Sequence, residues 1–121
     1  MKYILAVDDE PLNRDIIEEA LSGENEVLSV EDGLQCLESV SKRKPDMILV
    51  DYAMPGMDGI EVCKRLRAEK ETQDIPILML SGYAAKEHIE YGMQAGANYY
   101  ITKPFVPSEL LKLIRNVFNP E

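Results

Sequence analysis

Side chains suited to phosphate and metal chemistry stand directly after short apolar runs of this sequence, at four separate places. In chain order they are Asp8, Asp9 and Glu10, then Asp51, then Ser81, and finally Thr102 and Lys103. Carboxylate oxygens bind hard divalent cations such as Mg²⁺, while a hydroxyl and an ammonium can hold the oxygens of a phosphoryl group. The set points to phosphoryl chemistry supported by a metal ion, provided that the fold brings the four places together.

The apolar runs themselves predict the strands that would position these side chains. Runs 3–7, 47–50 and 77–80 are nearly continuous in apolar residues, which is typical of central parallel strands covered on both faces. Runs 27–30 and 99–102 contain polar residues, as expected for strands at the edges of a sheet. Helical spacing of apolar residues fills the segments between the runs. This alternation predicts one α/β domain over residues 1–121, with helices on both faces of a doubly wound, five-stranded parallel sheet.

The edge strands, together with the known strand order of flavodoxin-like folds, give the predicted order of the sheet. With 27–30 and 99–102 outermost, the strands take the order 2-1-3-4-5 of a flavodoxin-like fold, and strands 1 and 3 lie side by side where the winding reverses. Ligands of such sheets bind beyond the carboxyl ends of the strands at that point. Since neighbouring strands are about 4.8 Å apart, Asp8, Asp9 and Asp51 should repel one another. We therefore expect a raised pKa for at least one carboxyl group unless a cation intervenes.

Helix boundaries also have sequence signals. The start signals are Pro11, Asp58, and Pro107 with Ser108, and the stop signals are Gly23 and Gly96. The segment 86–95 is the weakest predicted helix, because it contains Gly92 and has chiefly Ile89 and Met93 as apolar anchors. We expect this helix to be loosely held, with His88 exposed on it.

Composition excludes several classes of function. The chain has 13 basic and 22 acidic residues, a net charge of −9, and such a surface repels nucleic-acid phosphates and anionic lipids. No apolar run approaches the roughly 18 residues of a membrane span. We expect neither direct nucleic-acid binding nor membrane insertion. Cys36 and Cys63 fall in separate predicted helices as partly buried residues, which suits a reducing, cytoplasmic setting. With a single histidine and no nearby cysteine, a metal would be held by oxygen.

Each residue of the set has an ordinary explanation when it stands alone. Asp8 and Asp9 can cap the following helix, and Asp51 can be a turn residue. The set becomes specific because its members occupy the ends of four predicted strands that are neighbours in the predicted sheet order. Once a metal ion and Lys103 neutralise an incoming phosphate, the Asp51 carboxylate can act as a nucleophile and form an acyl phosphate, with Ser81 holding a phosphoryl oxygen.

The segment Asp51-Tyr-Ala-Met-Pro-Gly-Met-Asp-Gly59, together with Asp8, Asp9, Ser81 and Lys103-Pro-Phe105, resembles the receiver domain of bacterial two-component response regulators. The resemblance covers essentially the whole chain. Among receiver domains, the chain is similar to the single-domain receivers of chemotaxis. It implies that Asp51 accepts a phosphoryl group from a histidine kinase or a histidine phosphotransfer protein, with Mg²⁺ as cofactor.

The resemblance also implies roles for the remaining residues. Asp9 and Asp51 would bind Mg²⁺ directly, Asp8 through water, and Ala53 through its main-chain carbonyl. Ser81 stands where the family most often has threonine, and would bond a phosphoryl oxygen, while Lys103 would pair with the phosphate. A cis bond between Lys103 and Pro104 is expected.

A switch follows from the same resemblance. A phosphoryl group that draws Ser81 toward Asp51 would vacate space for Tyr100, shifting the face formed by segment 86–95, strand 99–102 and the last helix. That face would dock on a downstream target protein. The chain would then be a signalling switch and not an enzyme, with only self-directed phosphotransfer and dephosphorylation. Tyr83, two residues beyond Ser81, would shield the acyl phosphate from water.

Three rival interpretations stay open on the sequence. A flavin binder of the same architecture would need a hydroxyl- and glycine-rich phosphate loop where this chain has Asp8, Asp9 and Glu10. An aspartyl-phosphate hydrolase would usually carry an acid at the position of Ala53. A pure interaction module would not need the acidic set. Because no effector domain follows the last predicted helix, we expect action through partner proteins, either as a stand-alone receiver or as part of a longer regulator or hybrid kinase.

Overall fold

Five strands form one parallel sheet in the order β2-β1-β3-β4-β5, as predicted. The computed structural model describes residues 1–120. Its strands are β1 (Lys2–Val7), β2 (Asn25–Val30), β3 (Met47–Asp51), β4 (Ile77–Ser81) and β5 (Tyr99–Thr102). Four strands extend one or two residues beyond the apolar runs that predicted them. At the carboxyl ends of β3 and β4 the extension takes in Asp51 and Ser81, so both residues belong to the rigid sheet.

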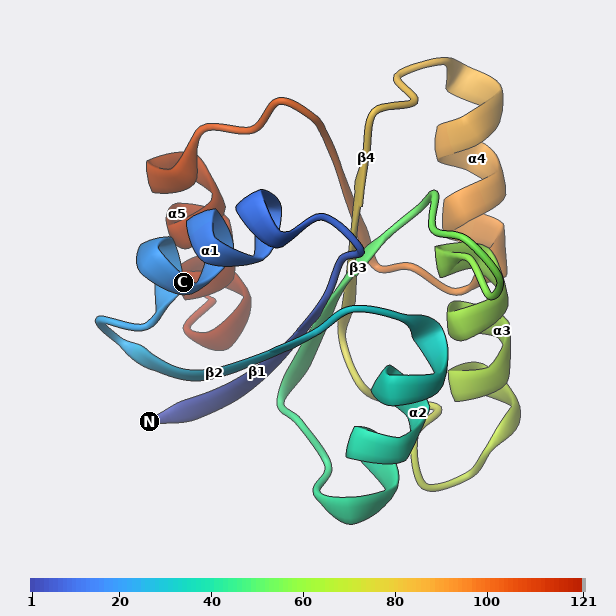
Figure 1. Cartoon of the computed structure of the whole chain (residues 1–121), viewed down its shortest axis with the longest axis horizontal. Helices are drawn as coiled ribbons and strands as arrows, with labels where there is room; N and C mark the ends of the chain where they lie inside the picture. The colour runs from blue at the N-terminus through green and yellow to red at the C-terminus, as the bar shows by residue number, and fades with distance from the viewer. Residues whose placement is uncertain (121) are drawn as a thin grey trace.

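Five helices connect the strands and cover both faces of the sheet. They are α1 (Pro11–Leu21), α2 (Gly33–Lys42), α3 (Gly59–Ala68), α4 (Lys86–Ala95) and α5 (Pro107–Phe118). Figure 1 shows α1 and α5 on one side of the sheet and α2, α3 and α4 on the other. No helix among residues 1–120 is long and apolar enough to cross a membrane.

Alternate residues of the central strands feed two separate apolar cores. Ile4 and Ala6 of β1 pack toward α1 and α5 with Ile17 and Ile114. Their neighbours in the strand, such as Leu5, belong to the opposite core, which lies under α2, α3 and α4. The two-residue period of a strand sends successive side chains to opposite faces, so a strand buried on both faces must be apolar throughout. This burial is why the runs were recognisable, and it holds the strand ends in place.

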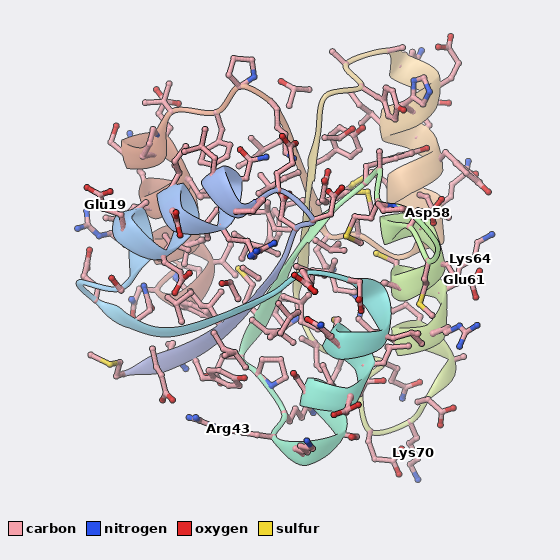
Figure 2. The ribbon with its side chains drawn as sticks, viewed as in Figure 1. Glu19, Arg43, Asp58, Glu61, Lys64 and Lys70 are labelled. Carbon is pink, nitrogen blue, oxygen red and sulfur yellow. The ribbon has the colours of Figure 1, made fainter. Side chains whose placement is uncertain are left out.

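The predicted helix signals are mostly confirmed. The Asp58 carboxylate accepts a hydrogen bond from the Glu61 amide at 2.9 Å and caps α3, and both residues are labelled at that helix in Figure 2. Pro11 and Pro107 occupy the first turns of α1 and α5. The expectation for Ser108 as a start signal was wrong, because α5 begins at Pro107 and Ser108 lies inside its first turn. Gly96 ends α4 with φ = 128°, a conformation that side chains strongly disfavour.

The anchors of α4 differ from the prediction. Met93 is 42% exposed and is not an anchor; the buried residues of α4 are Gly92 and Ala95. A Cβ built on Gly92 would lie 3.1–3.2 Å from two carbons of the Tyr100 ring. The helix therefore approaches the sheet through its smallest residues, because the Tyr100 ring occupies the space that a larger side chain would need.

Cys36 and Cys63 are fully buried in the core under α2 and α3, not partly buried as expected. Burial raises the pKa of each thiol to about 12. Since the thiolate is the reactive form, both cysteines act as apolar core residues.

Gly59 allows the start of α3 to pack directly on the strand end that carries Asp51. A Cβ at this position would lie 2.4 Å from the Asp51 carbonyl oxygen and 3.0 Å from Tyr52 Cα. These are backbone atoms that cannot move aside without displacing Asp51. We predict that Gly59→Ala lowers the free energy of unfolding by about 1–3 kcal/mol, in spite of the better helix propensity of alanine.

Urea unfolding followed by circular dichroism measures this effect. Gly23→Ala is the matched control, because nothing lies within 4 Å of a Cβ built there. A Gly59→Ala variant as stable as Gly23→Ala would contradict the packing of α3 against Asp51.

Candidate functional site

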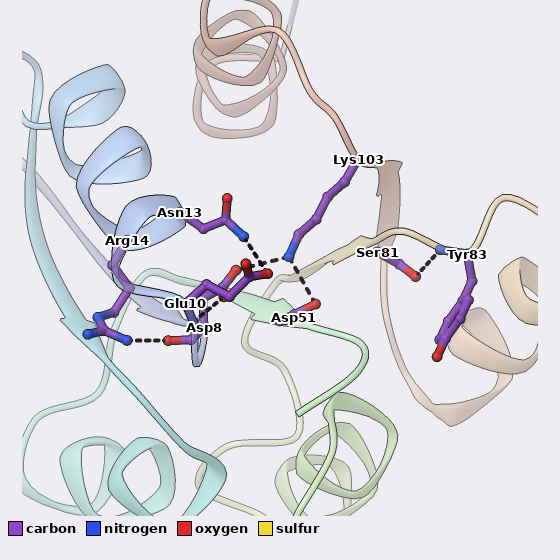
Figure 3. Close-up of polar contacts among 8 residues, drawn as sticks. All are labelled: Asp8, Glu10, Asn13, Arg14, Asp51, Ser81, Tyr83 and Lys103. Carbon is purple, nitrogen blue, oxygen red and sulfur yellow. Dashed lines mark hydrogen bonds and ion pairs between the residues drawn. The ribbon is translucent and has the colours of Figure 1, made fainter. Parts of the chain in front are cut away.

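The predicted residues meet at the carboxyl edge of the sheet, around the ends of β1 and β3. Asp8 follows β1, Asp51 ends β3 and Ser81 ends β4, and all three are buried. Lys103 follows β5 and extends its side chain toward Asp51 and Asp8, as Figure 3 shows. Four segments distant in the sequence thus converge on one site, as the strand order predicts.

Three carboxylates are crowded at this edge. One oxygen from each of Asp8, Asp9 and Asp51 lies within 4.8 Å of the others. All the donors are oxygens, and the cluster is negatively charged, which fits Mg²⁺ better than softer metals that prefer nitrogen or sulfur. The residues present therefore fit the metal that the sequence predicts.

Lys103 provides the positive charge of the site. Its Nζ lies 3.1 Å from Asp8 Oδ2 and 3.1 Å from Asp51 Oδ1. Its backbone N–H donates to the carbonyl of Ser81 at 2.7 Å, which ties the chain beyond β5 to the end of β4. The expected cis peptide between Lys103 and Pro104 is confirmed.

The electrostatics of the site favour a partly protonated Asp51 when no cation besides Lys103 is present. Burial, followed by the repulsion of Asp8, raises the pKa of Asp51 from 3.8 to about 6, although Lys103 opposes this rise. Burial alone would lower the pKa of Lys103, but the charges of Asp51 and Asp8 outweigh it and raise that pKa. The predicted repulsion between the strand-end acids is confirmed.

The three acids differ in how far their oxygens are already engaged. Asp8 Oδ1 accepts from the Glu10 amide at 2.9 Å, and Asp8 Oδ2 accepts from Lys103. The Arg14 guanidinium donates to the Asp8 carbonyl at 2.7 Å and fixes the same residue from α1 (Figure 3). By contrast, the Asp9 side chain makes no hydrogen bond or ion pair with any of residues 1–120. Asp9 is thus the more available carboxylate, and Asp8 the more firmly held.

Within residues 1–120, no hydrogen bond joins the Ser81 hydroxyl or Ala53 to the Asp51 carboxylate. Ser81 Oγ accepts the Tyr83 N–H at 2.9 Å. A hydroxyl that accepts one hydrogen bond still has its own hydrogen to donate. Ala53 is an exposed residue of the loop after β3, two positions beyond Asp51.

Tyr100 is connected to Ser81 through the backbone of Tyr83. The Tyr100 hydroxyl donates to the Tyr83 carbonyl at 2.8 Å, and the N–H of the same residue bonds Ser81. Tyr83 is 45% exposed, and its ring lies on the far side of Ser81 from Asp51 (Figure 3). In this structure the ring does not cover Asp51.

His88 is the residue that the sequence interpretation missed. We expected it to be exposed, yet it is half-buried and stacks on Tyr83 with ring centroids 4.5 Å apart and planes at 19°. Tyr52 lies edge-on to both rings. No local pattern around position 88 signals this contact, because it depends on how the β4–α4 loop folds back over α4.

Comparison with known proteins gives the family. The model of the response regulator receiver domain matches residues 4–115. The phosphate regulon transcriptional regulatory protein PhoB of Pseudomonas aeruginosa is 42% identical over 117 residues, covering 96% of this chain and 51% of that protein. The DNA-binding response regulator MtrA of Mycolicibacterium smegmatis is 38% identical, covering 93% and 48%. The chain spans about half the length of these two relatives. Chemotaxis protein CheY-3 of Vibrio cholerae is 38% identical, covering 95% and 90%.

Solved structures agree in fold. Vibrio cholerae chemotaxis protein CheY4 superposes with a TM-score of 0.91 at 35% identity, covering 97% of this chain and 98% of that one. The receiver domain of sensor histidine kinase PA1611 from Pseudomonas aeruginosa has a TM-score of 0.87 at 34% identity, covering 95% of each chain. That structure contains a magnesium ion coordinated in the active-site cleft. On its sequence, sheet order and acidic strand-end site, this chain belongs to the response regulator receiver domain family of two-component signalling.

Proposed function

We propose that this chain is a phosphorylation-dependent signalling switch in which Asp51 accepts a phosphoryl group from a phosphohistidine of a histidine kinase or phosphotransfer protein. The observation that carries the proposal is the Lys103 ammonium, 3.1 Å from the Asp51 carboxylate inside a cluster of acids. A lysine held by two buried acids can pair with a further anionic group that arrives at Asp51.

The metal roles are those that the family resemblance implies. Asp9 and Asp51 would hold Mg²⁺ directly, together with the carbonyl of Ala53, while Asp8 would act through water; the hydrogen bonds that both Asp8 oxygens already accept are consistent with this role. When bound, the ion would supply positive charge that neutralises the carboxylates and the incoming phosphoryl oxygens. The magnesium in the PA1611 receiver domain supports this assignment.

The chain's own residues then perform the transfer. An Asp51 oxygen attacks phosphorus as the P–N bond of the donor breaks and its electron pair returns to the imidazole nitrogen. Lys103 compensates the charge of the phosphoryl oxygens. Ser81 donates its hydroxyl hydrogen to one of them, since its Oγ needs only a lone pair to keep the bond from Tyr83. Asp51 must be ionised to attack. Its degree of ionisation depends on the charges around it, since Asp8 raises its pKa and Lys103 lowers it.

Tyr100 would transmit the conformational change caused by phosphorylation to the surface of the domain. Any movement of Ser81 toward the phosphoryl group pulls on the Tyr83 amide, and the Tyr83 carbonyl holds the Tyr100 hydroxyl. The Tyr100 ring packs against Gly92 of α4. Phosphorylation would therefore shift the surface formed by α4, β5 and α5, on which a downstream target protein docks.

Other activities are less well supported. Ala53 offers no acid to help hydrolyse external phosphate esters, so we propose only self-directed transfer and dephosphorylation. MtrA is named a DNA-binding regulator, but this chain matches about half of it and has a net charge of −9. We therefore assign no nucleic-acid contact to this domain.

The proposal predicts a covalent adduct at one residue. After incubation with acetyl phosphate and Mg²⁺, intact mass spectrometry should show one added phosphoryl group on the native chain and none on Asp51→Asn, because the amide is not a nucleophile. Asp74→Asn is the matched control, since Asp74 is an exposed aspartate that pairs with Lys44 at the opposite edge of the sheet. An adduct on Asp51→Asn equal to the native one would overturn the assignment.

The raised pKa of Asp51 predicts a dependence of stability on pH. The folded state binds the Asp51 proton more tightly than the unfolded chain, so this group costs stability progressively as pH rises from about 4 to about 6. At 1.36 kcal/mol per pKa unit the cost reaches up to about 3 kcal/mol at pH 7.5. In EDTA, Asp51→Asn should be more stable than the native chain by up to this amount at pH 7.5.

Urea unfolding of both proteins at pH 4 and pH 7.5 tests the dependence. The advantage of Asp51→Asn should be small at pH 4, where Asp51 is protonated in the folded state and about half protonated in the unfolded chain, and saturating Mg²⁺ should reduce it at pH 7.5. A difference between the two proteins that stays constant across this pH range would contradict the crowding of charge at Asp51.

A further inference from the structure

His88 belongs to a group of four rings that links separate parts of the site, hereafter the ring cluster. Its members are Tyr52 after β3, Tyr83 in the β4–α4 loop, His88 of α4 and Tyr100 of β5. Tyr52 immediately follows Asp51, and Tyr83 lies two residues beyond Ser81. The ring cluster thus touches both strand ends that carry the proposed phosphorylation site.

The imidazole of His88 contacts two of these rings in different ways. It stacks face to face on Tyr83 at 4.5 Å and 19°, and it meets Tyr52 edge-on at 5.9 Å and 80°. Parallel and edge-on pairs at these separations are both favourable arrangements of flat rings. His88 therefore holds the Tyr83 ring against the body of the protein from the helix side.

Hydrogen bonding at Nδ1 does not explain the presence of His88. Nδ1 is buried and has no hydrogen-bond partner among residues 1–120. An unpaired buried nitrogen is unfavourable by itself. What the side chain contributes is its flat ring, so another flat ring should serve in its place.

Tyr83 needs such support because its loop has little of its own. Residues 82–85 are all exposed. Yet the Tyr83 backbone joins Ser81 Oγ, through its N–H, to the Tyr100 hydroxyl, through its carbonyl. Only two side-chain dihedral angles separate the ring from this backbone, so holding the ring restrains the amide and the carbonyl together.

We propose that His88 is a positioning residue whose stacked ring holds Tyr83 in place as the link between Ser81 and Tyr100. This proposal rests on the proposed function, since the link matters only if a phosphoryl group at Asp51 moves Ser81. Without the stacked ring, the loop would open more often. A phosphoryl group at Asp51 would then have a smaller effect on the conformation of Tyr100.

Amide hydrogen exchange measured by NMR tests the anchoring directly. The Tyr83 amide is bonded to Ser81, so its exchange rate reports how often the link opens. Losing one stacked pair in His88→Ala should speed exchange of this amide by about threefold to tenfold, without a change at Leu80 in β4. His88→Phe should stay within about twofold of the native rate, because it keeps the ring. Tyr91→Ala is the control, since it removes an exposed aromatic ring from the same helix outside the ring cluster.

A second measurement separates positioning from simple packing. With Mg²⁺ and beryllofluoride, a non-covalent analogue of the phosphoryl group, the Tyr100 amide resonance should shift in the native chain and in His88→Phe. In His88→Ala the shift should be clearly smaller. Native exchange at Tyr83 together with a full Tyr100 response in His88→Ala would overturn the role of His88. If the Tyr100 resonance of the native chain does not shift on addition of beryllofluoride, the proposed function is overturned instead. The exchange rates would still decide whether His88 anchors Tyr83.

Discussion

Crowded negative charge at the carboxyl edge of the sheet is the constraint on which the rest of the site depends. Three carboxylates share one small region, and two of them, Asp8 and Asp51, are buried. The single ammonium of Lys103 contacts both buried acids but leaves the site with an excess of negative charge. Such a site is stabilised by an added cation, and its charge balance changes again when an anionic group arrives beside Lys103.

The fold makes this crowding unavoidable. Parallel strands β1 and β3 are neighbours, so the acids that follow them must lie close together. The two apolar cores bury both faces of these strands and prevent the strand ends from separating. Gly59 allows the start of α3 to pack on the Asp51 backbone, so Asp51 cannot move away from the other acids in that direction. Apolar packing therefore holds the mutually repelling carboxylates together. This packing does not depend on whether a cation or a phosphoryl group occupies the site.

The strands and their strand-end acids were predictable because their signals are local, while the order of the strands also relied on the known order of flavodoxin-like folds. A buried strand must be apolar along its length, and the residue after it falls at the edge, so Asp8, Asp51 and Ser81 could be placed from the sequence. The rotation of α4 was not predictable, and Met93 was wrongly chosen over Gly92 as its contact with the sheet. That contact depends on where Tyr100 lies, which no nearby residue determines. For the same reason the stacking of His88 on Tyr83 required coordinates, since it arises from a loop folding back on a helix. The roles of Asp9 and Ala53 toward a metal come from family resemblance, which the geometry supports without replacing.

Titration of the Asp51 side-chain carboxyl by ¹³C NMR tests the central claim most directly. In EDTA the resonance should titrate with an apparent pKa of about 6, and saturating Mg²⁺ should lower that value toward the ordinary range of an aspartate. An Asp51 carboxyl that titrates near 4 in EDTA and does not respond to Mg²⁺ would contradict the account, because neither the crowding of charge nor its relief by a cation would then exist.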